Sequence, residues 1–260
     1  MEISLSGRAA MITGASKGLG LAIATRFAES GADVALLARR PDVLEEAKAT
    51  VGARAKGRVA VFPCDVSKGS DIARAHAGVM ERFGKVDILV NNAGESKAMP
   101  FTQITDETWQ ADLDLKLFAA IRTARLVLDG MKARKWGRII NVLNIGAKAP
   151  RAGGAPTAVS RAAGMALTKI LASEYAPHNV LVNAMLVGQI VSDQWVRRHH
   201  AQGQNVTFEE FIGKMGANIP LGRLGTAEEF ANLACFLASD AAGFVTGTAI
   251  NVDGGASPVV

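Results

Sequence analysis

The sequence predicts an α/β fold in which a doubly wound parallel sheet of about seven strands carries helices on both faces. Short, almost wholly apolar runs alternate with segments of helical periodicity, which is the pattern of strands buried on both sides of a sheet. Glycines gather in the turn between the first apolar run and the first helical segment. No shift in composition marks a linker, so we expect the 260 residues to form one domain.

The strands are expected where the apolar runs recur. The first run, 9–12, has the length and the all-apolar character of a strand buried on both faces. The later strands are expected at 33–37, 58–63, 86–92, 138–143, 180–186 and 249–252.

Helices are expected between these strands. After the glycines, Leu21, Ala24 and Phe27 recur at helical spacing, and Asp42 is a suitable N-cap for the next helix. The further predicted helices cover 43–51, 67–83, 105–132, about 155–175 and 227–239. On the longest of these, the residues expected to share one stripe are Trp109, Leu113, Leu117, Ala120 and Ala124.

The glycine-rich turn predicts a site for the phosphates of a dinucleotide. Gly14, Gly18 and Gly20 lie where a strand turns into a helix. Such a turn offers unpaired backbone N–H groups and the positive end of the helix dipole, and no Cβ keeps a phosphate at a distance. A tight turn without a ligand is the alternative, but the strand before it and the helix after it favour the binding site.

Charge and cysteine content exclude several other functions. The net charge is +5, but basic and acidic residues are interleaved, which disfavours nucleic-acid binding. Cys64 and Cys235 lie far apart in apolar segments, which predicts buried thiols rather than a disulfide or a metal site. No apolar run approaches the roughly 20 residues that span a bilayer, and the chain enters its first strand almost at once. We therefore expect a soluble cytoplasmic protein that binds no metal and no membrane.

Four motifs follow one another along the chain. They are TGASKGLG at 13–20, Asp65-Val66, NNAG at 91–94, and a C-terminal pair, GFVTG at 243–247 with NVDGG at 251–255. In this order and spacing they resemble the short-chain dehydrogenase/reductase family, from about residue 5 to residue 256. The resemblance implies a Rossmann-type dinucleotide-binding domain over 1–260, an oxidoreductase acting on a small carbonyl or alcohol substrate, and a homo-oligomer, either tetramer or dimer.

The residues after the second strand favour NADP(H) over NAD(H). A carboxylate there usually binds a free ribose 2′-hydroxyl, whereas a 2′-phosphate needs cations. This chain has Arg39 and Arg40, with Lys17 in the glycine-rich turn and no acid before Asp42. The alternative is that both arginines only solvate a loop. The resemblance implies that the cofactor is contacted by Gly14, Ser16, Lys17, Gly18, Leu19, Gly20, Arg39, Arg40, Asp65, Val66, Asn91, Ala93, Gly94, Arg161, Gly188 and Ile190.

By the same resemblance, this chain departs from the family at all four positions of its usual catalytic tetrad. Lys116 stands where the family has Asn, Asn144 where it has Ser, Thr157 where it has the proton-donating Tyr, and Arg161 where it has Lys. The only tyrosine, Tyr175, falls at the far end of the same helix, where we expect a structural role.

The replacements differ in what they can do chemically. Arg161 can donate hydrogen bonds to ribose hydroxyls but remains protonated, and Thr157 lacks the acidity and the length of a tyrosine. Lys116 can titrate if burial and a nearby Arg161 lower its pKa. The alternatives are that Lys116 is a surface lysine whose ammonium reaches solvent and that Asn144 only satisfies a turn.

These residues leave three functions open. In the first, the protein is an NADP(H)-dependent oxidoreductase in which Lys116 or a water supplies the proton and Asn144 orients the carbonyl. In the second, it is a lyase or isomerase in which Lys116, Arg161 and Asn144 form a cationic pocket that stabilises an oxyanion. In the third, it binds the nucleotide without turnover. The fold alone does not choose among the three.

The segment 189–215 is expected to be an insertion that closes over the substrate, as in the family that the chain resembles. It carries Trp195, a candidate wall of the substrate pocket, and the Arg/His run 197–200, a candidate site for anionic substrates or otherwise a solvated helix face.

Two helices have the composition of a packing interface between subunits. Small residues are frequent in the predicted helix 155–175, and an apolar stripe runs along 227–239. Both suit close packing across two-fold axes, and burial within one chain is the alternative. The residues concerned are Ala158, Ala162, Ala163, Gly164 and Ala166 in the first helix and Phe230, Leu233, Phe236 and Leu237 in the second.

Overall fold

The computed structural model describes residues 3–191, 199 and 206–260. Seven strands form one sheet in the order β3-β2-β1-β4-β5-β6-β7, and all neighbours pair in parallel. The chain therefore builds the sheet outward from β1 in one direction and from β4 in the other. The strands are β1 Ala9–Thr13, β2 Asp33–Ala38, β3 Val59–Pro63, β4 Ile88–Asn91, β5 Gly137–Asn144, β6 Val180–Val187 and β7 Ala249–Val252.

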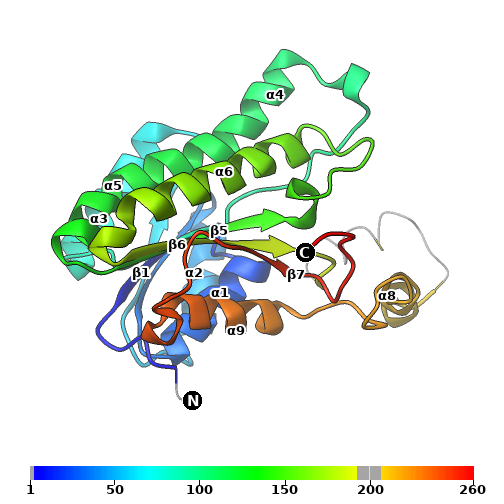
Figure 1. Cartoon of the computed structure of the whole chain (residues 1–260). Coiled ribbons are helices and arrows are strands. Elements are labelled where there is room, and N and C mark those ends of the chain that lie inside the picture. The colour runs from blue at the N-terminus through cyan, green and yellow to red at the C-terminus, as the bar shows by residue number, and fades with distance from the viewer. Residues whose placement is uncertain (1–2, 192–198, 200–205) are drawn as a thin grey trace.

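Helices cover both faces of this sheet, as the sequence predicts (Figure 1). One face carries α1 (Gly18–Glu29), α2 (Pro41–Gly52) and α9 (Ala227–Ala238). The other face carries α3 (Gly69–Phe83), α5 (Ala119–Ala133) and α6 (Thr157–Tyr175). The shorter elements are α4 Asp106–Leu113, α8 Phe208–Gly216, the π-turn η2 Asp114–Phe118, and the 3₁₀ turns η1 Phe101–Gln103, η3 Ile145–Ala147, η4 Ala176–His178 and η5 Asp240–Ala242.

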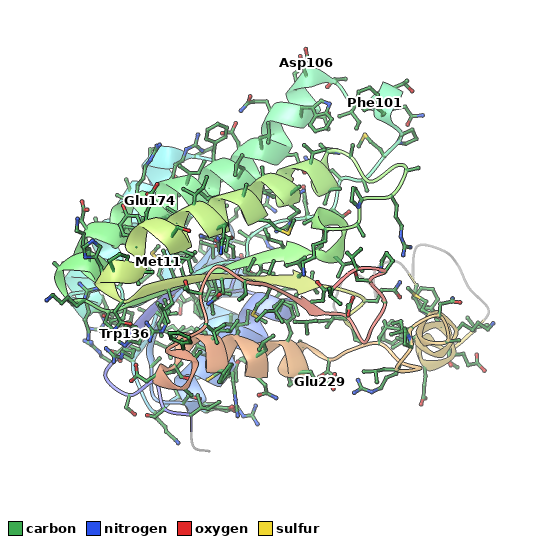
Figure 2. All side chains as sticks on the ribbon, viewed as in Figure 1. Met11, Phe101, Asp106, Trp136, Glu174 and Glu229 are labelled. Atoms are coloured by element: carbon green, nitrogen blue, oxygen red, sulfur yellow. The ribbon has the colours of Figure 1, made fainter. Side chains whose placement is uncertain are left out.

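The core lies in two apolar layers, one on each side of the sheet. In β1, Ala10 and Ile12 face the layer shared with α1 and α9, whereas Ala9 and Met11 face the layer shared with α3 and α5. Figure 2 shows Met11 between the two helical layers. This alternation follows from the two-residue period of a strand, and it explains why the strands read as continuous apolar runs.

Two sequence predictions about helices are corrected by the structure. Asp42 is not an N-cap: α2 already begins at Pro41, and Arg40 holds the cap position, because proline at the first helical position loses no hydrogen bond. The helix predicted over 105–132 is interrupted by the π-turn η2, which adds a residue to one turn. The buried residues of α4 and η2 are Asp112 and Lys116, while the predicted stripe residues Trp109, Leu113 and Leu117 are only partly buried.

The prediction on the two cysteines is confirmed, whereas part of the predicted insertion lies outside the described residues. Cys64 and Cys235 are both buried free thiols, as predicted. In the insertion predicted over 189–215, residues 192–198 and 200–205, and with them Trp195 and most of the Arg/His run, lie outside the described residues. Across the ranges that the structure does describe, none of the helices combines the length and apolar character needed to cross a bilayer.

Candidate functional site

The site lies where β1 and β4 end, at the point where the sheet order reverses direction. Asn92 holds the two strand ends together: its side-chain amide donates to the carbonyl oxygens of Thr13 at 3.0 Å and of Gly14 at 3.1 Å. In return, the Thr13 hydroxyl accepts from the backbone N–H groups of Asn92 at 3.0 Å and Ala93 at 3.1 Å. The glycine-rich turn is thereby fixed against the NNAG segment.

The glycines of the turn make a close approach of backbone to backbone possible. Gly14 has φ +66°, and a Cβ on it would lie 2.9 Å from the Cα of Ala93. A Cβ on Gly20 would lie 2.2 Å from the carbonyl oxygen of Gly14, so Gly20 is required for the turn to pack on the start of α1. The Lys17 side chain does not cap the start of α1, so the first N–H groups of this helix suit a phosphate.

Two adjoining cavities open at this turn, and together they have the size expected for a dinucleotide and its substrate. The first, about 520 Å³, is lined by predicted site residues Gly14, Lys17, Gly18, Leu19, Ala93, Gly94, Asn144, Thr157, Arg161, Gly188 and Ile190. The second, about 510 Å³, is lined by Gly14, Ser16, Arg39, Arg40, Asp65, Val66, Ala93 and Gly94.

Three predicted site residues line neither of these cavities. Gly20 lies behind the turn, as described above. Asn91 uses its side chain inside the protein, where it donates to Asn141 at 2.9 Å and accepts from Thr123 at 2.7 Å. Lys116 is buried and does not line the first cavity, but its ammonium donates to Thr157, which does. The structure brings the other predicted residues to the surface of the cleft.

The second cavity has exposed cations at one end. Arg39 and Arg40 line it, and none of the ion pairs among the described residues uses either guanidinium. The carboxylate of Asp65, in contrast, is engaged by the backbone N–H and the hydroxyl of Ser67. Cys64 also lines the cavity, but burial above all raises the pKa of its thiol to about 11, so it is not a nucleophile at neutral pH.

The alternative that Lys116 is a surface lysine is wrong. Its side chain is 2% exposed, and its ammonium donates to the Asp112 carboxylate and, at 2.9 Å, to the Thr157 hydroxyl. Burial is the main cause that lowers the pKa of Lys116, and the Arg161 guanidinium lowers it further. The carboxylates of Asp112 and Glu95 oppose this shift. Lys116 is therefore a buried ammonium whose pKa is lowered, not a surface lysine whose ammonium reaches solvent.

The Thr157 hydroxyl connects this buried ammonium to the cleft. It accepts two hydrogen bonds, one from Lys116 and one from the backbone N–H of Lys97 at 3.0 Å. A hydroxyl has two acceptor lone pairs and one hydrogen, so only the hydrogen remains to be donated. No acceptor for it lies among the residues that the structure describes, and Thr157 lines the first cavity. The hydroxyl is thus oriented to donate to a molecule in the cleft.

Asn144 and Arg161 also present unused hydrogen-bonding atoms. The Oδ1 atom of Asn144 is buried without a partner in the described chain, so this oxygen does not cap the turn η3 that follows β5. Arg161 donates to the carbonyl oxygen of Val142, and its Nε atom is likewise buried without a partner among the described residues. Burial lowers the pKa of Arg161 to about 10, which leaves it charged at neutral pH.

A third, smaller cavity of about 220 Å³ adjoins the first. Asn144 and Thr157 line both, so the boundary between the two cavities passes their side chains. Its further lining is mostly apolar or small, with one guanidinium, and comes from Ser96, Ala98, Ile145, Gly146, Ala149, Arg151, Gly154, Ala158, Ser257 and Pro258.

Sequence reasoning missed two residues of this arrangement, Asp112 and Ser160. The Asp112 carboxylate accepts from Lys116 and, at 2.6 Å, from the Ser160 hydroxyl. The spacing of four residues between Asp112 and Lys116 was a signal, because such pairs share a helix face. The expected apolar stripe on that helix pointed to a different face.

The chain is similar to known proteins over almost its whole length. The chain matches the family profile described as enoyl-(acyl carrier protein) reductase over residues 14–257. It is 39% identical over 257 residues to the protein assigned as ketoacyl reductase of the monensin polyketide synthase in Streptomyces virginiae, covering 96% of this chain and 97% of that protein.

Two solved structures are similar over essentially the whole chain. L-sorbose reductase from Gluconobacter frateurii, in complex with NADPH and L-sorbose, is 34% identical with a TM-score of 0.95, and 100% of each chain is covered. An apo short-chain oxidoreductase from Pseudomonas aeruginosa PAO1, described as containing an atypical catalytic center, is 34% identical with a TM-score of 0.91, covering 99% of this chain and 100% of that one.

Proposed function

Because the chain belongs to the short-chain dehydrogenase/reductase family, we propose that it is an NADP(H)-dependent oxidoreductase acting on a small carbonyl or alcohol substrate through a Thr157–Lys116 proton path. One observation carries the proposal: the Thr157 hydroxyl is held by Lys116 with its hydrogen left to donate into the first cavity.

The lining of the two cavities fits a phosphorylated dinucleotide. Gly14 leaves no room for a Cβ, and the N–H groups at the start of α1 suit a pyrophosphate. Arg39 and Arg40 would hold the ribose 2′-phosphate, and the unpartnered Nε of Arg161 suits a hydroxyl of the second ribose. When bound, the nicotinamide supplies or accepts a hydride at the substrate carbon.

This chain's own residues then bind the substrate oxygen and move its proton. In the direction of reduction, the Thr157 hydroxyl and the Asn144 amide hydrogen-bond to the carbonyl oxygen at the boundary of the first and third cavities. As that oxygen gains charge, Thr157 gives it a proton and takes one from the Lys116 ammonium. Lys116 becomes a neutral amine, and Thr157 returns a proton to it from water once the product has left.

In this proposal Lys116, Asn144, Thr157 and Arg161 replace the family's usual tetrad. The threonine hydroxyl does not need the acidity of a phenol, since it passes on a proton rather than storing one. The proton comes from the Lys116 ammonium, whose pKa burial lowers from its ordinary value, which makes it a better proton donor.

The test combines binding and turnover. Calorimetric titration with NADPH and NADH is followed by incubation of the NADPH-loaded enzyme with a panel of small aldehydes, ketones and keto acids. We expect tight NADPH binding, weaker NADH binding, and loss of NADPH absorbance with at least one substrate. Turnover without nucleotide would instead indicate the lyase or isomerase, and tight NADPH binding without any turnover would indicate a silent nucleotide-binding protein.

We also propose that the protein is a homo-oligomer, either tetramer or dimer. The apolar stripe of α9 does not support this, because Phe230 and Leu237 are buried against α1 in the same chain. The outer face of α6 does: Val159 and Ile170 are 51% and 54% exposed, and Ala163 and Ala166 lie between them at helical spacing.

A further inference from the structure

Asp112 is the most deeply buried carboxylate near the proposed site. Its side chain is 0% exposed, and it lines neither cavity beside the glycine-rich turn. It cannot touch the cofactor or the substrate from this position. Its partners are Lys116 on one carboxylate oxygen and Ser160, at 2.6 Å, on the other.

These contacts form two cross-links between neighbouring helical segments. The segments α4 and α6 lie side by side (Figure 1). Asp112 on α4 is joined to Ser160 on α6, and Lys116 on the following π-turn is joined to Thr157 on α6. The two pairs are linked to each other by the ion pair between Asp112 and Lys116. The position of the Lys116 ammonium against the Thr157 hydroxyl therefore depends on Asp112.

The charges around Lys116 give Asp112 a second effect. The described charged groups that act on the ammonium are Asp112 from α4, Arg161 from α6 and Glu95 from the loop after β4. Glu95 is 54% exposed and is shared with the Lys97 ammonium at 3.6 Å, so its influence is screened by solvent. Asp112 is the only buried carboxylate among these groups. Its charge raises the pKa of Lys116, which burial and the Arg161 guanidinium lower.

We infer that Asp112 is a positioning residue that acts through Lys116: its carboxylate fixes the ammonium on the Thr157 hydroxyl and keeps it charged, so that it can return a proton to Thr157 after each transfer. This inference rests on the proposed function and deepens it. It assigns a role to a residue that never meets the substrate.

The first test is the pH dependence of turnover in Asp112→Asn. Without the Asp112 carboxylate, only the solvent-screened Glu95 opposes the effects of burial and Arg161 on the pKa of Lys116, so Lys116 loses its proton at lower pH. We expect the midpoint of the pH–kcat profile to fall by at least about one unit, because an opposite charge in contact shifts a pKa by about 1–3 units. Carbonyl reduction should slow at pH values above the lowered midpoint, whereas alcohol oxidation, which needs the neutral amine, should not slow there. The affinity for NADPH should stay within about twofold of wild type, because Asp112 does not line the cleft.

The matched control is Asp114→Asn, two residues along, where the carboxylate pairs with Arg122 near the surface. It should leave the pH profile unchanged. If Asp112→Asn slows both directions equally at every pH, with an unmoved midpoint, Asp112 has only a structural role and the inference is overturned.

A second comparison holds even if Asp112→Asn folds poorly. Lys116→Met should lower kcat about 100-fold, the loss of one proton-transfer group. In the double variant Asp112→Asn with Lys116→Met, there is no ammonium left for Asp112 to position. Its kcat should therefore be no lower than that of Lys116→Met alone. A further loss in the double variant would contradict a role that acts through Lys116.

A readout without turnover separates this inference from the proposed function. In NMR spectra of the nitrogen-labelled protein recorded over a pH series, a protected ammonium signal that is absent in Lys116→Met identifies Lys116. In Asp112→Asn this signal should disappear at a lower pH than in wild type. Loss of the signal at the same pH in both proteins would refute the inference, whereas failure of wild type to turn over any substrate would refute only the proposed function.

Discussion

Thr157 is the residue on which the proposed chemistry depends, because among the described side chains its hydroxyl is the one that joins the buried ammonium to the cleft. Thr157→Val keeps the shape and removes the hydroxyl. We expect kcat for reduction to fall about 100-fold or more, the usual contribution of a proton-transferring group. The free energy of unfolding should fall by about 1–3 kcal/mol, since the Lys97 N–H and the Lys116 ammonium lose their acceptor.

Thr157→Ser is the control for this prediction, because serine retains the hydroxyl at the same position. It should keep most of the activity of the wild type. Steady-state kinetics together with urea unfolding measure both effects. A Thr157→Val enzyme with wild-type kcat would show that the proton comes from elsewhere, for example directly from water.

Arg39 and Arg40 are expected to determine the preference between the two nucleotides. Both are exposed at the end of the second cavity and have no ion pair within the described part of the chain. Arg39→Ala and Arg40→Ala should each weaken NADPH binding about 10-fold to 100-fold, the value of a hydrogen bond to a charged group, and change NADH binding by less than about twofold.

Calorimetry with both nucleotides measures this difference. Arg125→Ala, an exposed arginine on α5, is the control for a general loss of positive charge and should change neither affinity. Equal weakening of NADPH and NADH would mean that the arginines contact the cofactor elsewhere than at the 2′-phosphate.

At the scale of single elements, the π-turn η2 separates what the sequence predicts from what it does not. Helical periodicity correctly predicts a helical segment over 105–132, and Ala120 and Ala124 are buried as expected. Periodicity assumes 3.6 residues per turn, so it does not predict the extra residue of η2, and the buried residues of α4 and η2 are Asp112 and Lys116 rather than the expected stripe. Asp112, which lies behind the proposed proton path, is therefore at a position that helical periodicity does not single out.

The N-terminus of α9 gives a pH-dependent prediction. Glu229, which Figure 2 shows at the first turn of α9, accepts from Arg223 at 2.6 and 2.9 Å and from the backbone N–H of Thr226 at 2.8 Å. These bonds, the Arg223 hydrogen bond first, lower the pKa of Glu229 from 4.5 to about 2. Because the folded pKa lies below the unfolded value, the stabilisation is complete above about pH 4.5 and is lost as the pH falls toward 2.

Glu229→Gln should therefore lower the urea midpoint of unfolding above pH 4.5, and the difference from wild type should shrink as the pH falls toward 2. Glu228→Gln, one residue earlier on the same turn, is the control and should show no such convergence. A difference between wild type and Glu229→Gln that is constant with pH would exclude a contribution from the Glu229 charge.

For the whole molecule, the sequence predicted the architecture but not the inner part of the site. The seven-stranded parallel sheet and the two helical layers follow from alternating apolar runs and helical patterns, which depend on local spacing alone. The place of the cleft was also predicted, since strand ends in a parallel sheet converge at one edge, whereas most of its lining residues were named from the family resemblance. The hydrogen bond between Asp112 and Ser160 joins α4 to α6 across 48 residues of sequence. No local sequence pattern encodes such a contact.

The proposed assembly yields a prediction at the same scale. The exposed apolar residues Val159 and Ile170 on the outer face of α6 would be covered in a homo-oligomer. Val159→Glu together with Ile170→Glu places two carboxylates on that face. If two copies paired through it, four carboxylates would be buried together without a positive partner. We expect wild type to sediment as a dimer or tetramer and the double variant to sediment as a monomer of about 27.2 kDa.

The double variant should fold normally, because both side chains are more than half exposed and surface substitutions there change the free energy of unfolding by about 0.5 kcal/mol or less. Met80→Glu on α3 is the matched control, an exposed apolar residue outside the α6 face, and it should leave the assembly intact. If the double variant assembles like wild type, the α6 face is not the interface. If wild type is itself a monomer at all concentrations, the proposal of a homo-oligomer is wrong, and the cleft of a single chain, with its Thr157–Lys116 pair, must work on its own.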